Sequence, residues 1–255
     1  QSRSGHSRVI HLNRMSDIGW TEELTRLHEA AGNREHFMDT ASREQALRVL
    51  ERSLHTDARI LEIGSSSGYM LDALRRRFPR ALGSDVIHAP LVQLSHAGHA
   101  VARLDASRAP LRASSLDAIV ALNVLEHIQD DHEALLAMAH ALKPRGWLYI
   151  EVPANPALYD SYDRSLMHYR RYRMRDLRRM IDDAGLRVRM ASHLGCFIYP
   201  GFWLVKKRQG RETQTDMSIG RGSRFMRTVM TTERWLGDYV RYPFGIRCTV
   251  AAQKP

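Results

Sequence analysis

The chain has 255 residues, of which 44% are hydrophobic and 26% are charged. This composition is typical of a folded globular protein, and the length suits one α/β domain with a modest insertion, so disordered and fibrous classes are excluded. No window approaches the roughly 20 apolar residues that span a bilayer, and residues 1–14 lack the apolar core of a signal peptide. We therefore expect a cytoplasmic protein.

The net charge of +10 indicates which partners suit the chain, and the two cysteines indicate whether disulfides or a zinc site are expected. A basic chain suits nucleic acid, an anionic membrane surface or an acidic substrate, although its arginine-rich runs also suit the solvated faces of helices. Cys196 and Cys248 have no CxxC spacing, which indicates neither a disulfide framework nor a thiolate zinc site. No metal is expected.

An N-terminal arm, residues 1–41, precedes the expected domain, residues 42–255. Apolar spacing predicts a leading helix from Ser42 to Leu54, with Asp39 or Ser42 as its N-cap. Strands and helices then alternate, which predicts an α/β, Rossmann-like, mostly parallel seven-stranded sheet with helices on both faces. The expected strands are 59–63, 81–85, 100–104, 116–122, 147–152, 186–191 and 247–252; the expected helices between them are 67–78, 89–97, 131–142 and 173–184, and an inserted segment, 196–246, holds a helical stretch at 224–240.

Small residues link the first of these strands to the next helix. The glycines and serines from Gly64 to Gly68 let a backbone approach a ligand closely, as in a nucleotide-binding turn, although such turns also occur for tight packing. Asp85 ends the second strand about twenty residues further on, where a carboxylate can bind both hydroxyls of a ribose. The alternative for Asp85 is a surface residue that caps the next helix.

Glu62 separates two kinds of nucleotide ligand. It lies inside the first strand, two residues before Gly64. An anion there suits the amino end and sulfonium side of S-adenosylmethionine, whereas it would repel a pyrophosphate. The turn also lacks a full GxGxxG pattern, so a dinucleotide ligand is disfavoured.

These residues, together with the stretches 104–111 and 116–128, resemble the successive motifs of class I S-adenosylmethionine-dependent methyltransferases. The most similar branch is the small-molecule type that includes the ubiquinone and polyketide methyltransferases, and the resemblance covers about residues 42–195. Ser66 stands where the family usually has a second glycine, which predicts a slightly altered turn. The cofactor-binding residues that the resemblance implies are Glu62, Gly64, Ser66, Gly68, Asp85, Val86, Asp105, Ala106 and Asn123.

The resemblance also implies a role for each part of this set. Glu62 and Gly64 would contact the amino acid part of the cofactor, and Asp85 would bind the ribose. One adenine face would lie against Val86, while Asp105 and the backbone of the following residue, Ala106, would hold the adenine edge. Asn123 would lie at the mouth of the methyl-transfer site.

The acceptor is expected beyond the fourth and fifth strands, because ligands of open parallel sheets bind outside the carboxyl ends of the strands. A base is required only when the acceptor must lose a proton, and histidine titrates near neutral pH. His127 and His168 are therefore the candidate bases, although His127 could simply pack at the start of a short helix. The candidate acceptor-binding residues are Tyr162, Tyr169, Arg170, Arg171 and Trp203.

These candidate residues come from two segments. Tyrosines paired with Arg170 and Arg171 can clamp a phosphate or carboxylate, or the arginines can bind carboxylates of neighbouring helices. In the insertion, aromatic residues up to Trp203 precede a basic run, 206–208, which suits a contact with anionic lipid or a lid over a lipid-like acceptor. A buried lid that packs on the domain is equally consistent.

Three other functions stay open. A nucleic-acid methyltransferase suits the charge, but residues 123–126 do not match the Asn/Asp-Pro-Pro-aromatic motif and no RNA-binding module is evident. The others are a non-catalytic binding module and a nicotinamide-dependent oxidoreductase. The sequence favours methyl transfer from S-adenosylmethionine, by in-line displacement, to a small-molecule or lipid-like acceptor of phenolic, isoprenoid or glycolipid type.

Overall fold

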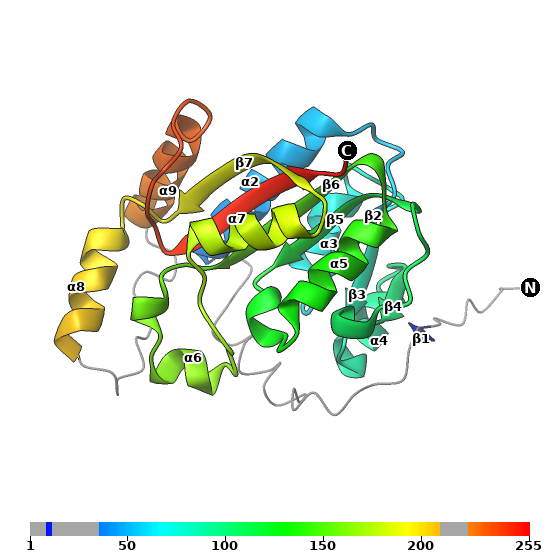
Figure 1. Ribbon diagram of the computed structural model, residues 1–255, viewed down its shortest axis with the longest axis horizontal. Helices are drawn as coiled ribbons and strands as arrows, with labels where there is room; N and C mark the ends of the chain where they lie inside the picture. Colours follow the sequence, from blue (N-terminus) through cyan, green and yellow to red (C-terminus); the bar gives the residue numbers. More distant parts are fainter. Residues whose placement is uncertain (1–8, 12–35, 210–223) are drawn as a thin grey trace, which may run out of the picture.

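The computed structural model of the protein describes residues 9–11, 36–209 and 224–255. Its strands form one sheet in the order β1-β4-β3-β2-β5-β6-β8-β7 (Figure 1). Neighbouring strands from β1 to β6 in that order are parallel, and β8 runs antiparallel to both β6 and β7. The strands are β1 (Ile10–His11), β2 (Ile60–Ile63), β3 (Leu82–Asp85), β4 (Val101–Arg103), β5 (Leu116–Leu122), β6 (Leu142–Pro153), β7 (Arg187–Leu194) and β8 (Arg247–Gln253).

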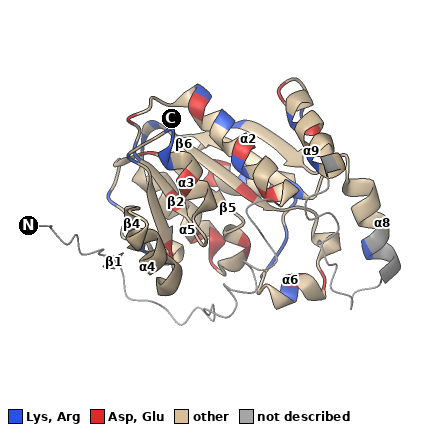
Figure 2. Ribbon diagram, turned by 180° about the vertical axis from the view of Figure 1, so that it is seen from behind, with Lys and Arg blue, Asp and Glu red and all other residues tan. Residues whose placement is uncertain are grey.

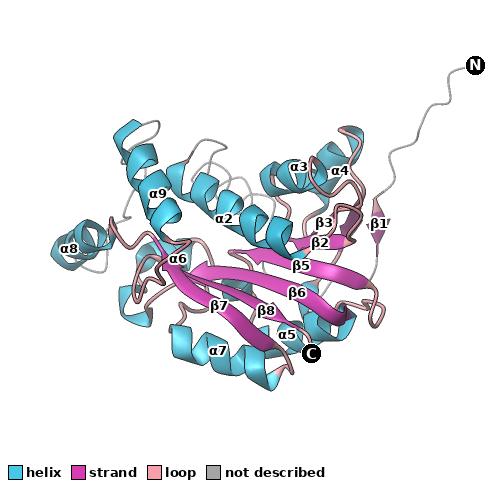
Figure 3. Cartoon of the chain, turned by 90° about the horizontal axis from the view of Figure 1, so that it is seen from above, coloured by secondary structure: helices cyan, strands magenta, loops and turns pink. Residues whose placement is uncertain are grey.

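Helices cover both faces of this sheet, as Figure 3 shows. On one face α2, α3 and α4 pack through a cluster that includes Leu50, Leu71 and Leu91, and on the other α5 and α7 pack through Leu135 and Leu177. The helices are α2 (Phe37–Ser53), α3 (Tyr69–Arg75), α4 (His88–His96), α5 (Asp131–Ala141), α6 (Ser161–Ser165), α7 (Met174–Asp183), α8 (Tyr199–Gln209) and α9 (Arg224–Leu236), and the single turns of 3-10 helix are η1 (Ala106–Arg108), η2 (Leu125–His127) and η3 (Pro156–Leu158). The predicted mostly parallel, seven-stranded Rossmann-like sheet is confirmed, with β1 as a short additional strand at its edge.

The predicted N-terminal arm joins the fold at both of its described parts. β1 pairs with β4, with Ile10 opposite Ala102. α2 begins at Phe37, ahead of the predicted boundary at residue 42, and the side chains of Phe37 and Met38 are buried. Burial of this first turn explains the earlier start, because packing outweighs the local capping preference.

The predicted N-cap of this helix was wrong. The N-cap is His36, and Asp39 and Ser42 both lie inside α2. Asp39 pairs with Arg247 of β8 at 2.8 Å, and the Ser42 hydroxyl donates to Glu151 at 2.7 Å. Both side chains therefore bind the sheet from inside the helix.

The insertion, residues 196–246, is anchored by charge as well as by apolar packing. Asp238, after α9, pairs with Arg48 and Arg52 of α2 at 2.7 and 3.1 Å. The buried carboxylate of Glu233 in α9 accepts three backbone hydrogen bonds at the end of β7, from the amides of Gly195, Cys196 and Phe197. The described parts of the insertion are thus fixed against the end of the sheet.

Charged residues of both signs occur on several helices. Basic residues are spread over α2, α6, α8 and α9, and acidic residues lie among them along α2 and α9 (Figure 2). None of the helices in the described part of the chain has the length and apolar character required to span a membrane.

Candidate functional site

The carboxyl ends of β2 and β5 mark the point where the strand order reverses. From β2 the chain proceeds outward through β3 and β4, and then continues on the other side through β5 and β6. Open α/β sheets bind ligands at such a point. The turn after β2 and the turn after β5 meet here, since a Cβ added to Gly64 would lie 2.6 Å from Cγ2 of Val124.

The turn from β2 to α3 depends on residues that tolerate a left-handed backbone. Gly64 and Gly68 have φ values of 80° and 77°. A side chain at Gly68 would also collide with Leu94, 2.2 Å from the added Cβ. Ser66, at the position that usually holds a second glycine in the resembled family, has a φ of 41°. The turn therefore keeps the left-handed geometry with serine in place of glycine, at a cost of about 1–2 kcal/mol.

Glu62 lies buried in β2 beside this turn. Its carboxyl group accepts a hydrogen bond of 2.9 Å from the Ser65 hydroxyl. Burial raises the pKa of Glu62 to about 8, and the hydrogen bond from Ser65 offsets only part of that rise. Without a ligand, Glu62 is therefore mostly protonated at neutral pH, whereas the sequence predicted an anion.

Asp85 ends β3 and ties it to the turn. Its two carboxylate oxygens accept backbone hydrogen bonds from Ser66 and Ile87, each of 2.9 Å. Ile87 is the N-cap of α4. Asp85 thus holds the turn against the start of α4 and is placed at the strand end where a ribose-binding carboxylate is expected.

Asp105 follows β4 and begins η1. It accepts hydrogen bonds from the amide and the hydroxyl of Ser107, at 2.9 and 2.6 Å. Asp105 and Ala106 are buried, and Val86, after β3, is half-buried. Along the carboxyl edge of the sheet, Val86 lies one strand away from Glu62, and Asp105 and Ala106 lie two strands away. This order fits the predicted contacts with adenine.

Beyond β5, a strained turn leads into a polar cluster. Asn123 has a φ of 53°, and its amide donates to the carbonyl of Glu151 at 2.8 Å. The rings of His127 and His168 meet edge to face, with centroids 4.7 Å apart. Glu126 lies buried beside them, and burial raises its pKa to about 8.

Ligand atoms of Glu126, His127 and His168 all lie within 4.8 Å of one another. Among the described residues, both carboxylate oxygens of Glu126 and Nε2 of His168 lack a hydrogen-bond partner. Such a group can hold a metal ion or surround a polar group of a substrate. The sequence predicted His127 and His168 as two separate candidate bases, and in the structure their rings are in contact.

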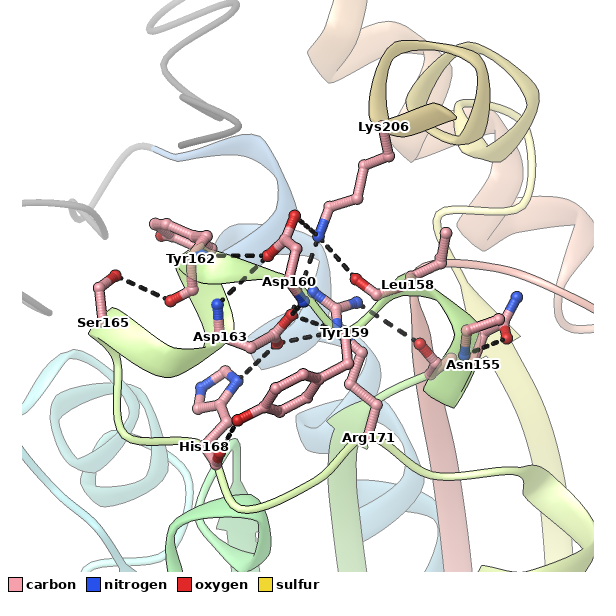
Figure 4. Close-up of polar contacts among 12 residues, drawn as sticks. Asn155, Leu158, Tyr159, Asp160, Tyr162, Asp163, Ser165, His168, Arg171 and Lys206 are labelled. Atoms are coloured by element: carbon pink, nitrogen blue, oxygen red, sulfur yellow. Dashed lines mark hydrogen bonds and ion pairs between the residues drawn. The ribbon is translucent and has the colours of Figure 1, made fainter. Parts of the chain in front are cut away.

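His168 is held by a buried aspartate that the sequence did not single out. Its Nδ1 lies 2.8 Å from Oδ1 of Asp163 (Figure 4). Arg171 donates from Nε to both oxygens of Asp163, each at 2.8 Å, and Lys206 lies 3.8 Å from the same carboxylate. Burial opposes ionisation, but the hydrogen bond from His168 and the charge of Arg171 hold the pKa of Asp163 well below its usual range.

The two arginines of the expected acceptor clamp are paired within the protein. Arg170 binds Asp131 at 2.8 Å and the carbonyl of Gln129 at 2.7 Å, and Arg171 binds Asp163. This is the alternative interpretation, in which the arginines bind carboxylates of neighbouring segments. Arg171 is buried, and its guanidinium is directed at Asp163 in this arrangement.

The basic run of the insertion follows, at Lys206, the alternative in which the insertion packs on the domain. The side chain of Lys206 is 6% exposed and pairs with Asp160 at 2.6 Å, because the helical turn of α8 directs it toward the segment after β6. The side chains of residues 207 and 208 lie outside the described residues. Trp203 in α8 and Tyr169 remain about half exposed, as an acceptor contact requires. Tyr162 is half-buried in α6, beside the capping box of Asp160 and Asp163.

With this geometry established, the family follows from sequence comparison. Residues 34–191 match the model of a family described as methyltransferase domain. The chain belongs to this family. The predicted class I S-adenosylmethionine-dependent methyltransferase family and its fold are confirmed.

Individual proteins that are similar to this chain are also methyltransferases. The chain is 28% identical over 142 residues to the ubiquinone biosynthesis O-methyltransferase of Hahella chejuensis, over 52% of this chain and 55% of that protein. Solved structures with a similar fold include phosphoethanolamine N-methyltransferase 2 of Haemonchus contortus in complex with S-adenosylmethionine, with a TM-score of 0.57 and 18% identity over 83% of this chain and 52% of that one. An S-adenosylmethionine-dependent methyltransferase from Archaeoglobus fulgidus gives a TM-score of 0.59 and 16% identity over 92% of this chain and 100% of that one. The chain spans about half the length of the first two relatives.

Proposed function

We propose that the protein transfers a methyl group from S-adenosylmethionine to a small-molecule or lipid-like acceptor of phenolic, isoprenoid or glycolipid type. The observation that carries this proposal is a row of three buried acidic residues, Glu62, Asp85 and Asp105, at the carboxyl edge of the adjacent strands β2, β3 and β4. The left-handed turn from Gly64 to Gly68 lies beside them. Together they offer hydrogen-bond acceptors to the ammonium, the ribose and the adenine amine of one extended ligand.

Each contact follows from the chemistry of the ligand. Glu62 binds the ammonium group as a carboxylate, so the bound cofactor favours loss of its proton. Asp85 accepts hydrogen bonds from the ribose hydroxyls, and Asp105 with the backbone of Ala106 binds the adenine edge beside Val86. Asn123 lies at the end of β5, next to the point where the sulfonium must sit.

The transfer itself is an in-line displacement on the methyl carbon, so the protein accelerates it chiefly by positioning. His168 is the base for an acceptor that must lose a proton, since Asp163 fixes its ring and its Nε2 lies near Glu126 and His127. His127 packs against His168 and contributes to the shape of the same space.

The acceptor binds between the segment after β6 and the insertion. Tyr169 and Trp203 offer exposed aromatic surface there, and Tyr162 lies in α6, ahead of both in the sequence. In α9 and the turn after it, Phe225 and Tyr239 are 72% and 77% exposed, which supports an apolar acceptor and a peripheral contact with an anionic membrane.

Two measurements test this function. Isothermal titration should show S-adenosylhomocysteine binding near micromolar affinity, about −8 kcal/mol, and no binding of a nicotinamide dinucleotide. The reverse preference would contradict the assignment. Trp203→Ala should reduce turnover of the acceptor with cofactor affinity unchanged, and an equal loss of cofactor affinity would remove Trp203 from the acceptor site.

A further inference from the structure

Asp163 is the most heavily bonded carboxylate in the segment between β6 and α7. It is fully buried in α6, and its carboxylate binds His168, Arg171 and the backbone amide of Asp160 (Figure 4). The backbone of His168 is held as well, since its amide donates to the carbonyl of Asp163 at 2.9 Å and its carbonyl accepts from the Tyr159 hydroxyl at 2.6 Å. Both the ring and the main chain of His168 are therefore fixed.

The contact between Asp163 and His168 determines which ring nitrogen of His168 keeps a lone pair. An ionised carboxylate accepts hydrogen bonds and cannot donate one, so the Nδ1 that faces Asp163 must carry the proton. In the neutral ring the lone pair then lies on Nε2. That atom is buried, has no hydrogen-bond partner among the described residues, and belongs to the cluster with Glu126 and His127.

Lys206 connects this arrangement to the insertion. Its ammonium pairs with Asp160 at 2.6 Å, donates to the carbonyl of Leu158 at 2.9 Å and lies 3.8 Å from Asp163. Arg171 binds the same carboxylate, so the buried side chain of Asp163 has two cations nearby. A buried charge is tolerated when it is paired and hydrogen-bonded in this way. Helix α8 is thus part of the support of His168, although it lies far away in the sequence.

We propose that Asp163 is the positioning residue of the methyl-transfer reaction, and that Lys206 of the insertion holds Asp163 so that His168 presents the lone pair of Nε2 to the acceptor. This inference rests on the proposed function above. The hydroxyl or amine of the acceptor gives its proton to Nε2, its electron pair forms the bond to the methyl carbon, and the carbon–sulfur bond breaks with its electron pair left on sulfur. The products are the methylated acceptor, S-adenosylhomocysteine and an imidazolium that returns its proton to water.

The groups that face His168 come from two sides. Asp163 from α6 binds Nδ1, and the cations Arg171 and Lys206 pair with Asp163. On the other side, Glu126 and His127 of η2 face the ring. Loss of the carboxylate at Asp163 removes the hydrogen-bond acceptor that fixes the proton on Nδ1.

The first test reads the ring directly and needs no acceptor. Long-range proton–nitrogen correlation spectra of the full chain at pH 8, with His168 assigned from the spectrum of His168→Gln, should show a protonated Nδ1 and an unprotonated Nε2. In Asp163→Asn the two forms of the ring should mix. The opposite tautomer in the wild type, or an unchanged His168 signal in Asp163→Asn, would overturn the proposal. Failure of the protein to bind S-adenosylhomocysteine would instead contradict the proposed function. The tautomer of His168 could still be read from the spectrum in that case.

The second test measures turnover with catechol as a probe acceptor. Asp163→Asn should lower kcat about tenfold or more, and His168→Ala should lower kcat about 100-fold. The double variant should lose no more than His168→Ala alone, because Asp163 acts through His168. Asp117→Asn, which loses a surface pair with Lys143 at the start of β5 and leaves this segment untouched, is the matched control and should retain full activity.

Lys206→Met should lower kcat with the affinity for S-adenosylhomocysteine within twofold of wild type, whereas Lys143→Met, which breaks a surface pair with Asp117, should have no effect. Additive losses in the double variant of Asp163 and His168 would contradict the proposal. So would loss of wild-type activity on treatment with a chelator and its recovery with zinc, because Nε2 would then be a metal ligand.

Discussion

The affinity of the protein for its cofactor should depend on pH through Glu62. Burial raises the pKa of this carboxyl to about 8 in the ligand-free protein, so about 1% of it is ionised at pH 6, about 9% at pH 7 and about half at pH 8. If the ammonium of S-adenosylhomocysteine binds the carboxylate, only this ionised fraction is competent. The dissociation constant should then fall about 50-fold between pH 6 and pH 8, or about 2.3 kcal/mol.

Isothermal titration in two buffers of different ionisation enthalpy measures this directly. Binding should release about 0.9 proton at pH 7 and about 0.5 at pH 8, since these are the protonated fractions of Glu62 in the free protein. Glu62→Gln should remove the proton release and flatten the pH dependence. Glu133→Gln, on the exposed surface of α5, is the matched control and should behave as wild type. A dissociation constant that is constant from pH 6 to pH 8 in the wild type, without proton release, would refute the pairing.

Three further predictions follow from the same site. Asp85→Ala should weaken binding of S-adenosylhomocysteine by about 1.5–3 kcal/mol in titration, the range for hydrogen bonds to a charged group, and unchanged affinity would remove Asp85 from the ribose. Ser66→Gly should retain cofactor affinity and raise the melting temperature, because glycine accepts the φ of 41° without strain. Ser66→Val should lower the melting temperature. Equal melting temperatures of the two variants would show that the turn stores no strain. The melting temperature of the ligand-free protein should fall from pH 6 to pH 9, because the folded state holds protons on Glu62 and Glu126 that the unfolded state has already lost, and Glu126→Gln should make this fall smaller. A melting temperature that rises over this range in the wild type would contradict the burial of these two carboxyls.

The strands and most helices could be predicted from the sequence because each β-α unit carries its own periodicity. The strand predicted at 116–122 is observed with the same ends, and the helix predicted at 173–184 is observed as Met174–Asp183. The start of α2 could not be found in this way. Its first turn is fixed by burial of Phe37 and by the pair between Asp39 and Arg247 of β8, and the local sequence contains no sign of either contact.

The positions of the proposed cofactor residues were predictable because these residues follow the strand ends in order along the chain. The support of His168 was not, since it joins α6, the turn before α7 and α8 of the insertion. The sequence could not choose between a lipid contact and a packed lid for the run that includes Lys206, because only the fold brings Asp160 beside it. Likewise, nothing in the sequence indicated that burial would leave Glu62 and Glu126 protonated near neutral pH.

Transfer of radioactive methyl from S-adenosylmethionine is the most direct test of the proposed function. The purified full chain would be incubated with the labelled cofactor and, in separate reactions, with phenols, isoprenoid quinone precursors, glycolipids and bulk RNA. The account predicts label in a small-molecule or lipid product, reduced about 100-fold in His168→Ala and retained in Asp117→Asn. Label in RNA at physiological salt, with none in any small molecule or lipid, would contradict it.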